Sequence, residues 1–288
     1  LTPASVAEIL APYKGHRTVN SALEAAVLDA WTRAAGISLA DHLGGVRPTV
    51  PTGVSVAIKD SIAELLETVD GYLAAGYGRI KLKIEPGRDV AVARAVREHI
   101  GPDVMLQVDA NAAYSLGDAA HLAKLDELDL VLIEQPLAWD DLAQHAELAR
   151  LIRTPICLDE SITSARSAAA AISLGACRII NIKPARVGGY LEARRIHDVA
   201  QAFGVPVWCG GMLESGLGRA ANLALASLPG FTLPGDISAT SRYYERDITR
   251  PFELDAEGRM AVPTGPGIGV DPDLGVLDEV TTWRASVS

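Results

Sequence analysis

Five short apolar segments, each closed by a charged residue, decide the fold: IKLK at 80–83, LQVD at 106–109, LIE at 132–134, ICLD at 156–159 and INIK at 180–183. Successive terminal charges are 24 to 26 residues apart. That spacing fits one strand, one helix and two loops, the repeating unit of a parallel β/α barrel. Because the C-terminal ends of barrel strands form the active-site face, the column of charges predicts a catalytic site.

Further apolar segments complete the predicted barrel. We expect strands at 50–57, 205–209 and 231–233, which makes eight strands, with helices between them. The segment 116–128 is one of these predicted helices. The tail from Ser238 is rich in Pro and Gly, with a short hairpin expected over 252–262. It is expected to pack on the helices that open the chain.

Three helices are predicted ahead of the first strand. Thr2-Pro3 starts the first, a capping-box pattern of Ser21 and Glu24 predicts the start of the second, and Ser38 to Leu43 forms the third. We therefore divide the chain into the helical part of a capping domain (1–48), a catalytic barrel (49–237) and a C-terminal segment (238–288). Because the chain opens at Leu1 without a preceding strand, we expect an N-terminal piece of the cap to be missing.

The composition is that of a globular protein acting on small molecules. Of the 288 residues, 49% are hydrophobic and 22% are charged. The net charge of −10 argues against nucleic acid or an anionic membrane as the main partner, because both require a basic surface. No apolar run is long enough for a membrane span, so a cytoplasmic protein is predicted. Cys157, Cys177 and Cys209 lack metal-ligand spacing and are predicted to be buried free thiols.

Three carboxylates in the charged column predict a metal site. Asp109, Glu134 and Asp159 end neighbouring strands, so their oxygens can converge. Carboxylates in close quarters repel one another unless a cation lies among them, and a hard ion such as Mg²⁺ prefers oxygen ligands. Mn²⁺ or another divalent ion could substitute. The alternative is that each carboxylate caps the helix that follows it, but the constant spacing favours the metal site.

Two lysines in the same column predict proton transfer. Lys83 and Lys183 lie four strands apart, on opposite sides of an eight-stranded barrel. A metal that binds a substrate carboxylate can stabilise an ene-diolate, while a lysine on either face removes or delivers the α-proton. The predicted chemistry is 1,1-proton transfer or β-elimination. A Schiff-base lysine is an alternative, because barrel aldolases use one, but it does not explain the three carboxylates.

Several stretches together resemble one known family. RIKLKIEPG, LQVDAN, LIEQPL, ICLDES, NIKPARVGGYLEARR and WCGGMLESGLGRAAN are similar to the o-succinylbenzoate synthase and N-acylamino acid racemase group of the enolase superfamily. The resemblance implies a (β/α)7β barrel with a capping domain, Mg²⁺ on Asp109, Glu134 and Asp159, and an acid/base pair of Lys83 and Lys183. It also implies a homo-oligomer.

The resemblance implies further roles at the mouth of the barrel. Ser55 and Lys81 would lie near the substrate carboxylate, and Asn111 beside the metal ligands. The backbone at Gly211 and Met212 would face the succinyl or acyl arm of the substrate.

The implied activity is o-succinylbenzoate synthesis in the menaquinone pathway, a syn dehydration of a cyclohexadiene carboxylate. The alternative is N-succinylamino acid racemisation in the same site. A hypothesis of another class is a barrel that binds a carboxylate ligand without catalysis.

Overall fold

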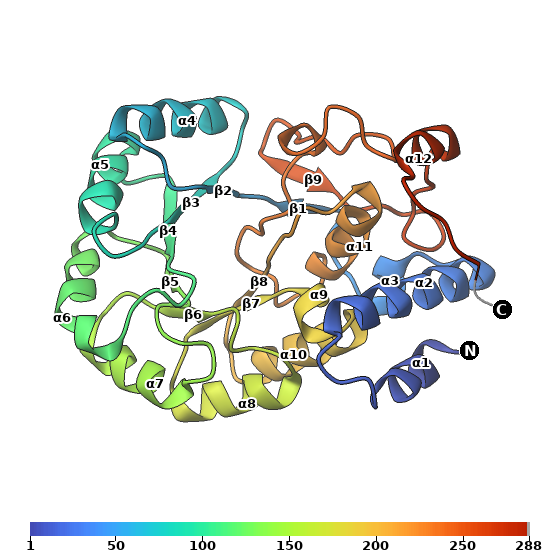
Figure 1. Cartoon of the computed structure of the whole chain (residues 1–288), viewed down its shortest axis with the longest axis horizontal. Helices are drawn as coiled ribbons and strands as arrows, with labels where there is room; N and C mark the ends of the chain where they lie inside the picture. The colour runs from blue at the N-terminus through green and yellow to red at the C-terminus, as the bar shows by residue number, and fades with distance from the viewer. Residues whose placement is uncertain (287–288) are drawn as a thin grey trace.

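The computed structural model describes residues 1–286 and shows a curved parallel sheet surrounded by helices (Figure 1). Within these residues the sheet has seven strands, and their order in space follows their order in the chain. The strands are β2 (Val54–Val56), β3 (Arg79–Lys83), β4 (Met105–Asp109), β5 (Ile133–Glu134), β6 (Ile156–Leu158), β7 (Ile179–Ile182) and β8 (Val207–Cys209). The predicted α/β barrel is confirmed.

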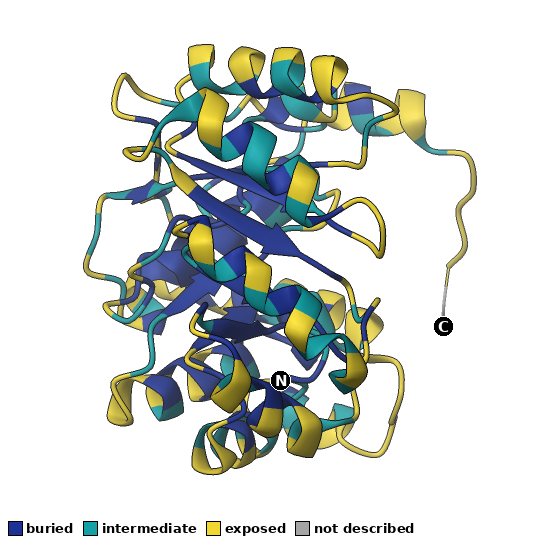
Figure 2. Ribbon diagram, turned by 90° about the vertical axis from the view of Figure 1, so that its left-hand side faces the viewer, coloured by how far each residue is buried: buried dark blue, intermediate teal, exposed yellow. Residues whose placement is uncertain are grey.

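Helices cover the outside of the sheet. They are α4 (Ile62–Ala74), α5 (Val90–Ile100), α7 (Leu142–Leu151), α8 (Ala165–Leu174), α10 (Tyr190–Ala202) and α11 (Gly216–Ala226). Several begin at a side-chain cap, as Ser61 does for α4 and Ser164 for α8. Figure 2 shows the strands buried and the outer helix faces exposed, so the core lies inside the barrel and between sheet and helices.

The connection between β4 and β5 differs from the single predicted helix over 116–128. It consists of a 3₁₀ turn (Leu116–Asp118), α6 (Ala119–Leu122) and a second 3₁₀ turn (Ala123–Glu127). Gly117 is a poor helix former. The Asp126 carboxylate accepts the backbone N–H of Thr154 at 2.8 Å, which ties this segment to the start of β6.

The predicted strand 50–57 is two strands. β1 (Thr49–Pro51) pairs antiparallel with β9 (Arg259–Ala261) outside the barrel, and β2 follows. Pro51 has no N–H to continue a ladder. The pairing also corrects the hairpin predicted over 252–262, because β9 finds its partner far away in the sequence.

The predicted eighth strand, 231–233, is reduced to isolated bridges. Phe231 bridges to Val207 of β8, and Gly235 bridges to Thr52, so this segment closes the barrel between β8 and β2. Pro234 interrupts the ladder because it cannot donate a hydrogen bond. The Arg47 guanidinium also donates hydrogen bonds to the carbonyl oxygens of Leu228, Pro229 and Phe231.

The helices at both ends of the chain lie on the same side of the barrel (Figure 1). They are α1 (Pro3–Leu10), α2 (Arg17–Ala35), α3 (Leu39–Leu43) and α12 (Leu274–Val280), while α9 (Pro184–Val187) contacts α2 from the barrel side. Arg33 of α2 pairs with Asp271 at 2.9 Å, and Asp29 accepts the N–H of Ile268 at 2.8 Å. The C-terminal segment therefore lies against α2. The boundaries at 48 and 237 stay a prediction.

Of two further sequence predictions, one is wrong and the other is confirmed. The capping box at Ser21 and Glu24 is wrong, because α2 begins at Arg17 and both residues are buried inside it. The three cysteines are buried and free, as predicted. Among the described residues no helix combines the length and the apolar character needed to cross a membrane.

Candidate active site

The five charged residues of the column stand at one end of the barrel. Lys83, Asp109 and Glu134 are the last residues of β3, β4 and β5, while Asp159 and Lys183 directly follow β6 and β7. The strand register places Lys83 beside Asp109 and Asp109 beside Glu134. Parallel pairing in register therefore brings together side chains that lie about 25 residues apart in the chain.

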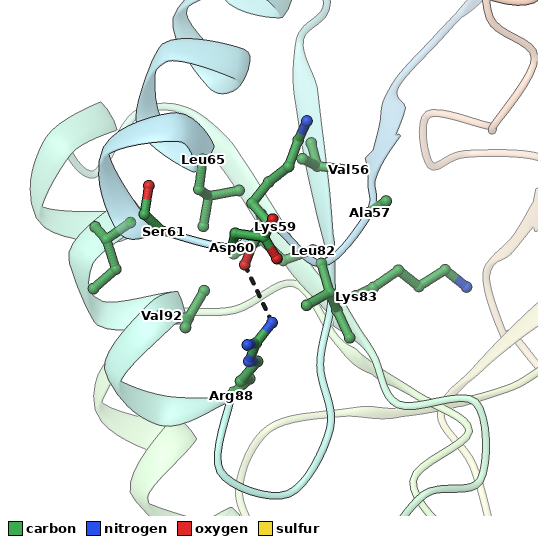
Figure 3. Close-up of a pocket in the computed structure, with 12 residues that line it drawn as sticks. Val56, Ala57, Lys59, Asp60, Ser61, Leu65, Leu82, Lys83, Arg88 and Val92 are labelled. Carbon is green, nitrogen blue, oxygen red and sulfur yellow. Dashed lines mark hydrogen bonds between the residues drawn. The ribbon is translucent and has the colours of Figure 1, made fainter.

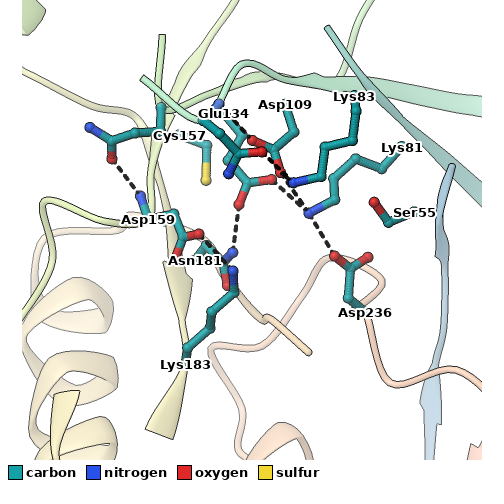
Figure 4. Close-up of polar contacts among 12 residues, drawn as sticks. Ser55, Lys81, Lys83, Asp109, Glu134, Cys157, Asp159, Asn181, Lys183 and Asp236 are labelled. Atoms are coloured by element: carbon teal, nitrogen blue, oxygen red, sulfur yellow. Dashed lines mark hydrogen bonds and ion pairs between the residues drawn. The ribbon is translucent and has the colours of Figure 1, made fainter. Parts of the chain in front are cut away.

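Each of the two predicted acid/base lysines is paired with one carboxylate (Figure 4). Lys83 Nζ lies 2.6 Å from Asp109 Oδ2 and 2.5 Å from Asn111 Oδ1. Lys183 Nζ lies 2.7 Å from Asp159 Oδ2. The two ammonium groups reach the site from different strands and are bonded to different carboxylates.

Lys81 occupies the buried centre of the site. Its side chain is 2% exposed, and Nζ lies 2.9 Å from Glu134 Oε2, 3.2 Å from Asp109 Oδ2 and 2.6 Å from Asp236 Oδ2. Burial alone would lower the pKa of Lys81, but the three carboxylates raise it well above its usual value. Lys81 is therefore a fixed positive charge.

Glu134 lies at the centre of the carboxylates. Burial raises the pKa of Glu134 to about 8, and the charges of Asp109 and Asp159 add to the effect while Lys81 and Lys183 oppose it. For Lys183, burial lowers the pKa, but Asp159 and Glu134 outweigh burial and raise it. Both Glu134 oxygens accept from donors, Oε1 from Asn181 and Oε2 from Lys81. A cation closer to the carboxylate would lower its pKa again, because an opposite charge favours the ionised form.

The donor chemistry of the three carboxylates fits a hard divalent cation. All three are buried, and one oxygen, Asp159 Oδ1, has no hydrogen-bond partner although Arg186 Nε lies 3.3 Å away. Over residues 1–286, no group of three His, Cys, Asp or Glu side chains is arranged to hold a metal ion, and each of the three carboxylates is instead paired with a lysine. The metal triad therefore stays a prediction.

The predicted substrate contacts surround this cluster. Ser55 on β2 is paired in register with Lys81, and its carbonyl oxygen accepts a hydrogen bond from Arg242. Asn111 adopts a left-handed conformation with φ of 42°, which turns its amide toward Lys83 and Glu160. The roles of these two residues in binding a substrate stay a prediction.

The loop after β8 carries the other two predicted contacts. A Cβ at Gly211 would lie 2.1 Å from the carbonyl oxygen of Asp236, so no side chain fits there. The Met212 side chain is exposed, and its N–H donates to both carboxylate oxygens of Glu214 at 2.9 and 2.8 Å. In this structure the Met212 amide is thus engaged within its own loop.

Asp236, a buried carboxylate that the sequence predictions missed, forms an ion pair with Lys81. Asp236 Oδ1 pairs with Arg79 Nη1 at 2.7 Å, and the Arg79 guanidinium lies over the Trp208 ring at 5.3 Å. Asn181 on β7 donates to Glu134 Oε1 at 2.6 Å. The charged column is recognised because a charged residue ends each predicted strand. Asp236 follows the predicted eighth strand, so the same feature could have identified it.

Replacing Asp236 by Asn is expected to destabilise the fold. Burial would raise the pKa of Asp236, but Lys81 and Arg79 hold it well below its usual value, so the residue is charged. Arg79 is 1% exposed and would lose its counter-charge. Breaking such a pair costs about 3–5 kcal/mol, or on the order of 10 °C in melting temperature. Thermal unfolding measures it, with Glu279→Gln in the exposed Arg246–Glu279 pair as control. Equal melting temperatures for both variants would contradict the prediction.

A small cavity lies beside this cluster rather than in it. It measures about 160 Å³ and is lined by Val56, Leu65, Leu82 and Arg88 among others (Figure 3). Lys83 is one of the lining residues, but its side chain extends away from Arg88 and toward Asp109. None of the three predicted metal ligands lines the cavity.

Comparisons with known proteins agree on one family. The family described as Enolase C-terminal domain-like matches residues 64–276. An N-succinylamino acid racemase of Amycolatopsis is 65% identical over 284 residues, covering 99% of this chain and 77% of the relative. An o-succinylbenzoate synthase of Geobacillus kaustophilus is 50% identical over 281 residues, covering 98% of this chain and 75% of the relative.

A solved structure supports the same assignment. A crystal structure of an enolase-superfamily member from Listeria innocua superposes with a TM-score of 0.92 at 42% identity. The superposition covers 97% of this chain and 75% of that one.

Proposed function

Because this chain belongs to the enolase superfamily, as an enzyme of the Enolase C-terminal domain-like family, we propose that it racemises N-succinylamino acids. The observation that carries this proposal is the placement of Lys83 at the end of β3 and Lys183 directly after β7, two strands that lie four apart in the sheet. Racemisation removes a proton from one face of the α-carbon and returns one to the other, so it requires two acid/base groups. The relative at 65% identity is named for this reaction.

We propose that Asp109, Glu134 and Asp159 hold Mg²⁺, for which Mn²⁺ or another divalent ion can substitute. The bound ion would supply a Lewis acid for the substrate carboxylate and stabilise the charge that develops on its oxygens. Two features support a cation at this place: the raised pKa of Glu134, and Asp159 Oδ1, which accepts no hydrogen bond although Arg186 Nε lies 3.3 Å away.

The chain's own side chains perform the proton transfers. One lysine of the pair takes the α-proton, and the other delivers a proton to the opposite face. Lys81, held by Asp236, places a fixed positive charge near the developing ene-diolate. Asn111 orients the Lys83 ammonium through the 2.5 Å contact. Ser55, Gly211 and Met212 would contact the substrate carboxylate and its acyl arm.

The second candidate function is o-succinylbenzoate synthesis, a step of the menaquinone pathway. The relative at 50% identity carries that name. Syn elimination of water also begins with removal of an α-proton, so the same site can perform both reactions. The resemblance puts dehydration first, whereas the higher identity to the racemase favours the opposite order. Cytoplasmic location and a homo-oligomer stay predictions.

Deuterium exchange tests the proposed function. In D₂O the protein should incorporate α-deuterium into both enantiomers of an N-succinylamino acid, because each face has its own lysine. The cyclohexadiene carboxylate is assayed in parallel for loss of water. A protein that neither exchanges the α-proton nor dehydrates would be a non-catalytic carboxylate-binding barrel. Inactivation by borohydride with a carbonyl substrate, together with resistance to chelator, would instead indicate a Schiff-base aldolase.

A further inference from the structure

A buried glutamate on α2 contacts the backbone that follows Lys183. Glu24 is 3% exposed, and its Oε1 accepts the N–H of Leu191 in the first turn of α10 at 3.1 Å. Burial raises the pKa of Glu24, although hydrogen bonds from the backbone of Leu191 and Tyr190 oppose the rise. The N-cap residue of α10 is Gly189, which offers no side-chain acceptor. Glu24 thus supplies from another helix the cap that α10 lacks.

Gly189 shows how closely α2 and the start of α10 pack together. Its φ of 145° lies in the region that favours glycine. A Cβ at this position would lie 2.1 Å from Glu24 Oε1 and 2.4 Å from Glu24 Cδ. The glycine therefore allows the carboxyl of Glu24 to approach the main chain.

The connection between Lys183 and α10 is short and contains two adjacent glycines. Lys183 is the N-cap residue of α9 and Gly188 is its C-cap residue, with a φ of 97°. Adjacent glycines leave a chain free to pivot unless other contacts hold it. Helix α2 provides those contacts, because Thr18 Oγ1 also donates to the carbonyl oxygen of Ala185 at 3.4 Å.

Lys83 is supported in a different way. It is the last residue of β3 and is paired in register with Asp109 of β4, so the sheet itself holds its backbone. We propose that Glu24 is a positioning residue for Lys183: by holding the first turn of α10 it fixes the far end of the segment 183–189, so that this ammonium stays on its face of the substrate. The inference rests on the proposed racemisation. It assigns helix α2 a role in proton transfer at one of the two faces of the substrate α-carbon.

Exchange measured separately for each enantiomer tests the proposal. Lys183→Arg identifies the enantiomer whose α-proton exchange depends on Lys183. Glu24→Ala should slow that exchange about 10- to 100-fold, because small displacements of a catalytic group carry penalties of this size. Exchange of the other enantiomer should change less than about twofold, since Lys83 keeps its support. Glu24→Asp retains the charge but shortens the reach, so it should show the same one-sided loss.

Two variants serve as controls. Glu24→Gln keeps an acceptor for the Leu191 N–H and should retain exchange of both enantiomers within about twofold. Glu8→Ala removes an exposed carboxylate of α1 that bonds to none of the described residues, and it should leave both rates unchanged. Circular dichroism and thermal unfolding verify that each variant is folded, and Glu24→Asp is the test if Glu24→Ala does not fold.

The outcomes separate the two proposals. Suppose that the wild-type enzyme exchanges both enantiomers. If the Glu24 variants then slow both exchange rates equally, or slow neither, the role of Glu24 is overturned and the proposed function is not. Failure of the wild-type protein to exchange either enantiomer would refute the proposed function, and this inference with it.

Discussion

Lys183→Arg is expected to lose racemisation by about 10²- to 10⁴-fold, the size of a general acid/base contribution. Arginine keeps a cation beside Asp159 but stays protonated, so it offers no usable base. Dehydration should fall much less, because syn elimination can use a single lysine as base and then as acid. The second lysine then contributes only positive charge near the developing ene-diolate.

Lys83→Arg is expected to lose both reactions. From the family resemblance we assign the base of the elimination to Lys83, which is 33% exposed at the side chain and the more accessible lysine of the pair. The measurement compares racemisation, dehydration and α-proton exchange of each enantiomer in both variants. If Lys183→Arg loses both reactions equally and exchanges neither enantiomer, this division of labour is wrong.

Chelation of divalent ions is expected to abolish turnover, and Glu134→Gln is expected to weaken Mg²⁺ binding by more than about 100-fold. Glutamine removes an anionic ligand from the buried centre and leaves a more positive pocket. Titration calorimetry with Mg²⁺ measures binding without relying on activity, and restored turnover after Mg²⁺ addition checks that chelation is reversible.

Exposed carboxylates provide the control for this experiment. Glu98→Gln changes the charge by the same amount on the outer face of α5 and should leave Mg²⁺ affinity unchanged. Full activity in excess chelator, or equal Mg²⁺ affinity in Glu134→Gln and the wild-type protein, would refute the metal-dependent mechanism.

Much of the barrel and its charged column could be predicted from the sequence. A strand buried on both faces is apolar over its length, so a charged residue that ends such a strand stands out. The regular spacing of Lys83, Asp109, Glu134, Asp159 and Lys183 then identifies the strands and the edge at which they end. The structure places all five residues at that edge.

The errors in the sequence predictions occur where a segment pairs with another segment far away in the chain. The predicted strand 50–57 divides because β1 pairs with β9, and 231–233 forms bridges rather than a strand. The pattern of Ser21 and Glu24 is that of a local capping box, yet Glu24 caps α10 instead. A local pattern identifies a hydrogen-bonding group but not its partner.

The sequence by itself determined the repeating unit, the order of the parallel strands and the types of residue at the strand ends, because strand and helix periodicity are local properties of the chain. Only the tertiary structure decided which charges pair. Lys81 bonds to Asp236 from 155 residues away, and Arg79 is buried beneath them. These partners follow from closure of the barrel, which depends on contacts between the two ends of the sheet and has no periodic signature in the sequence.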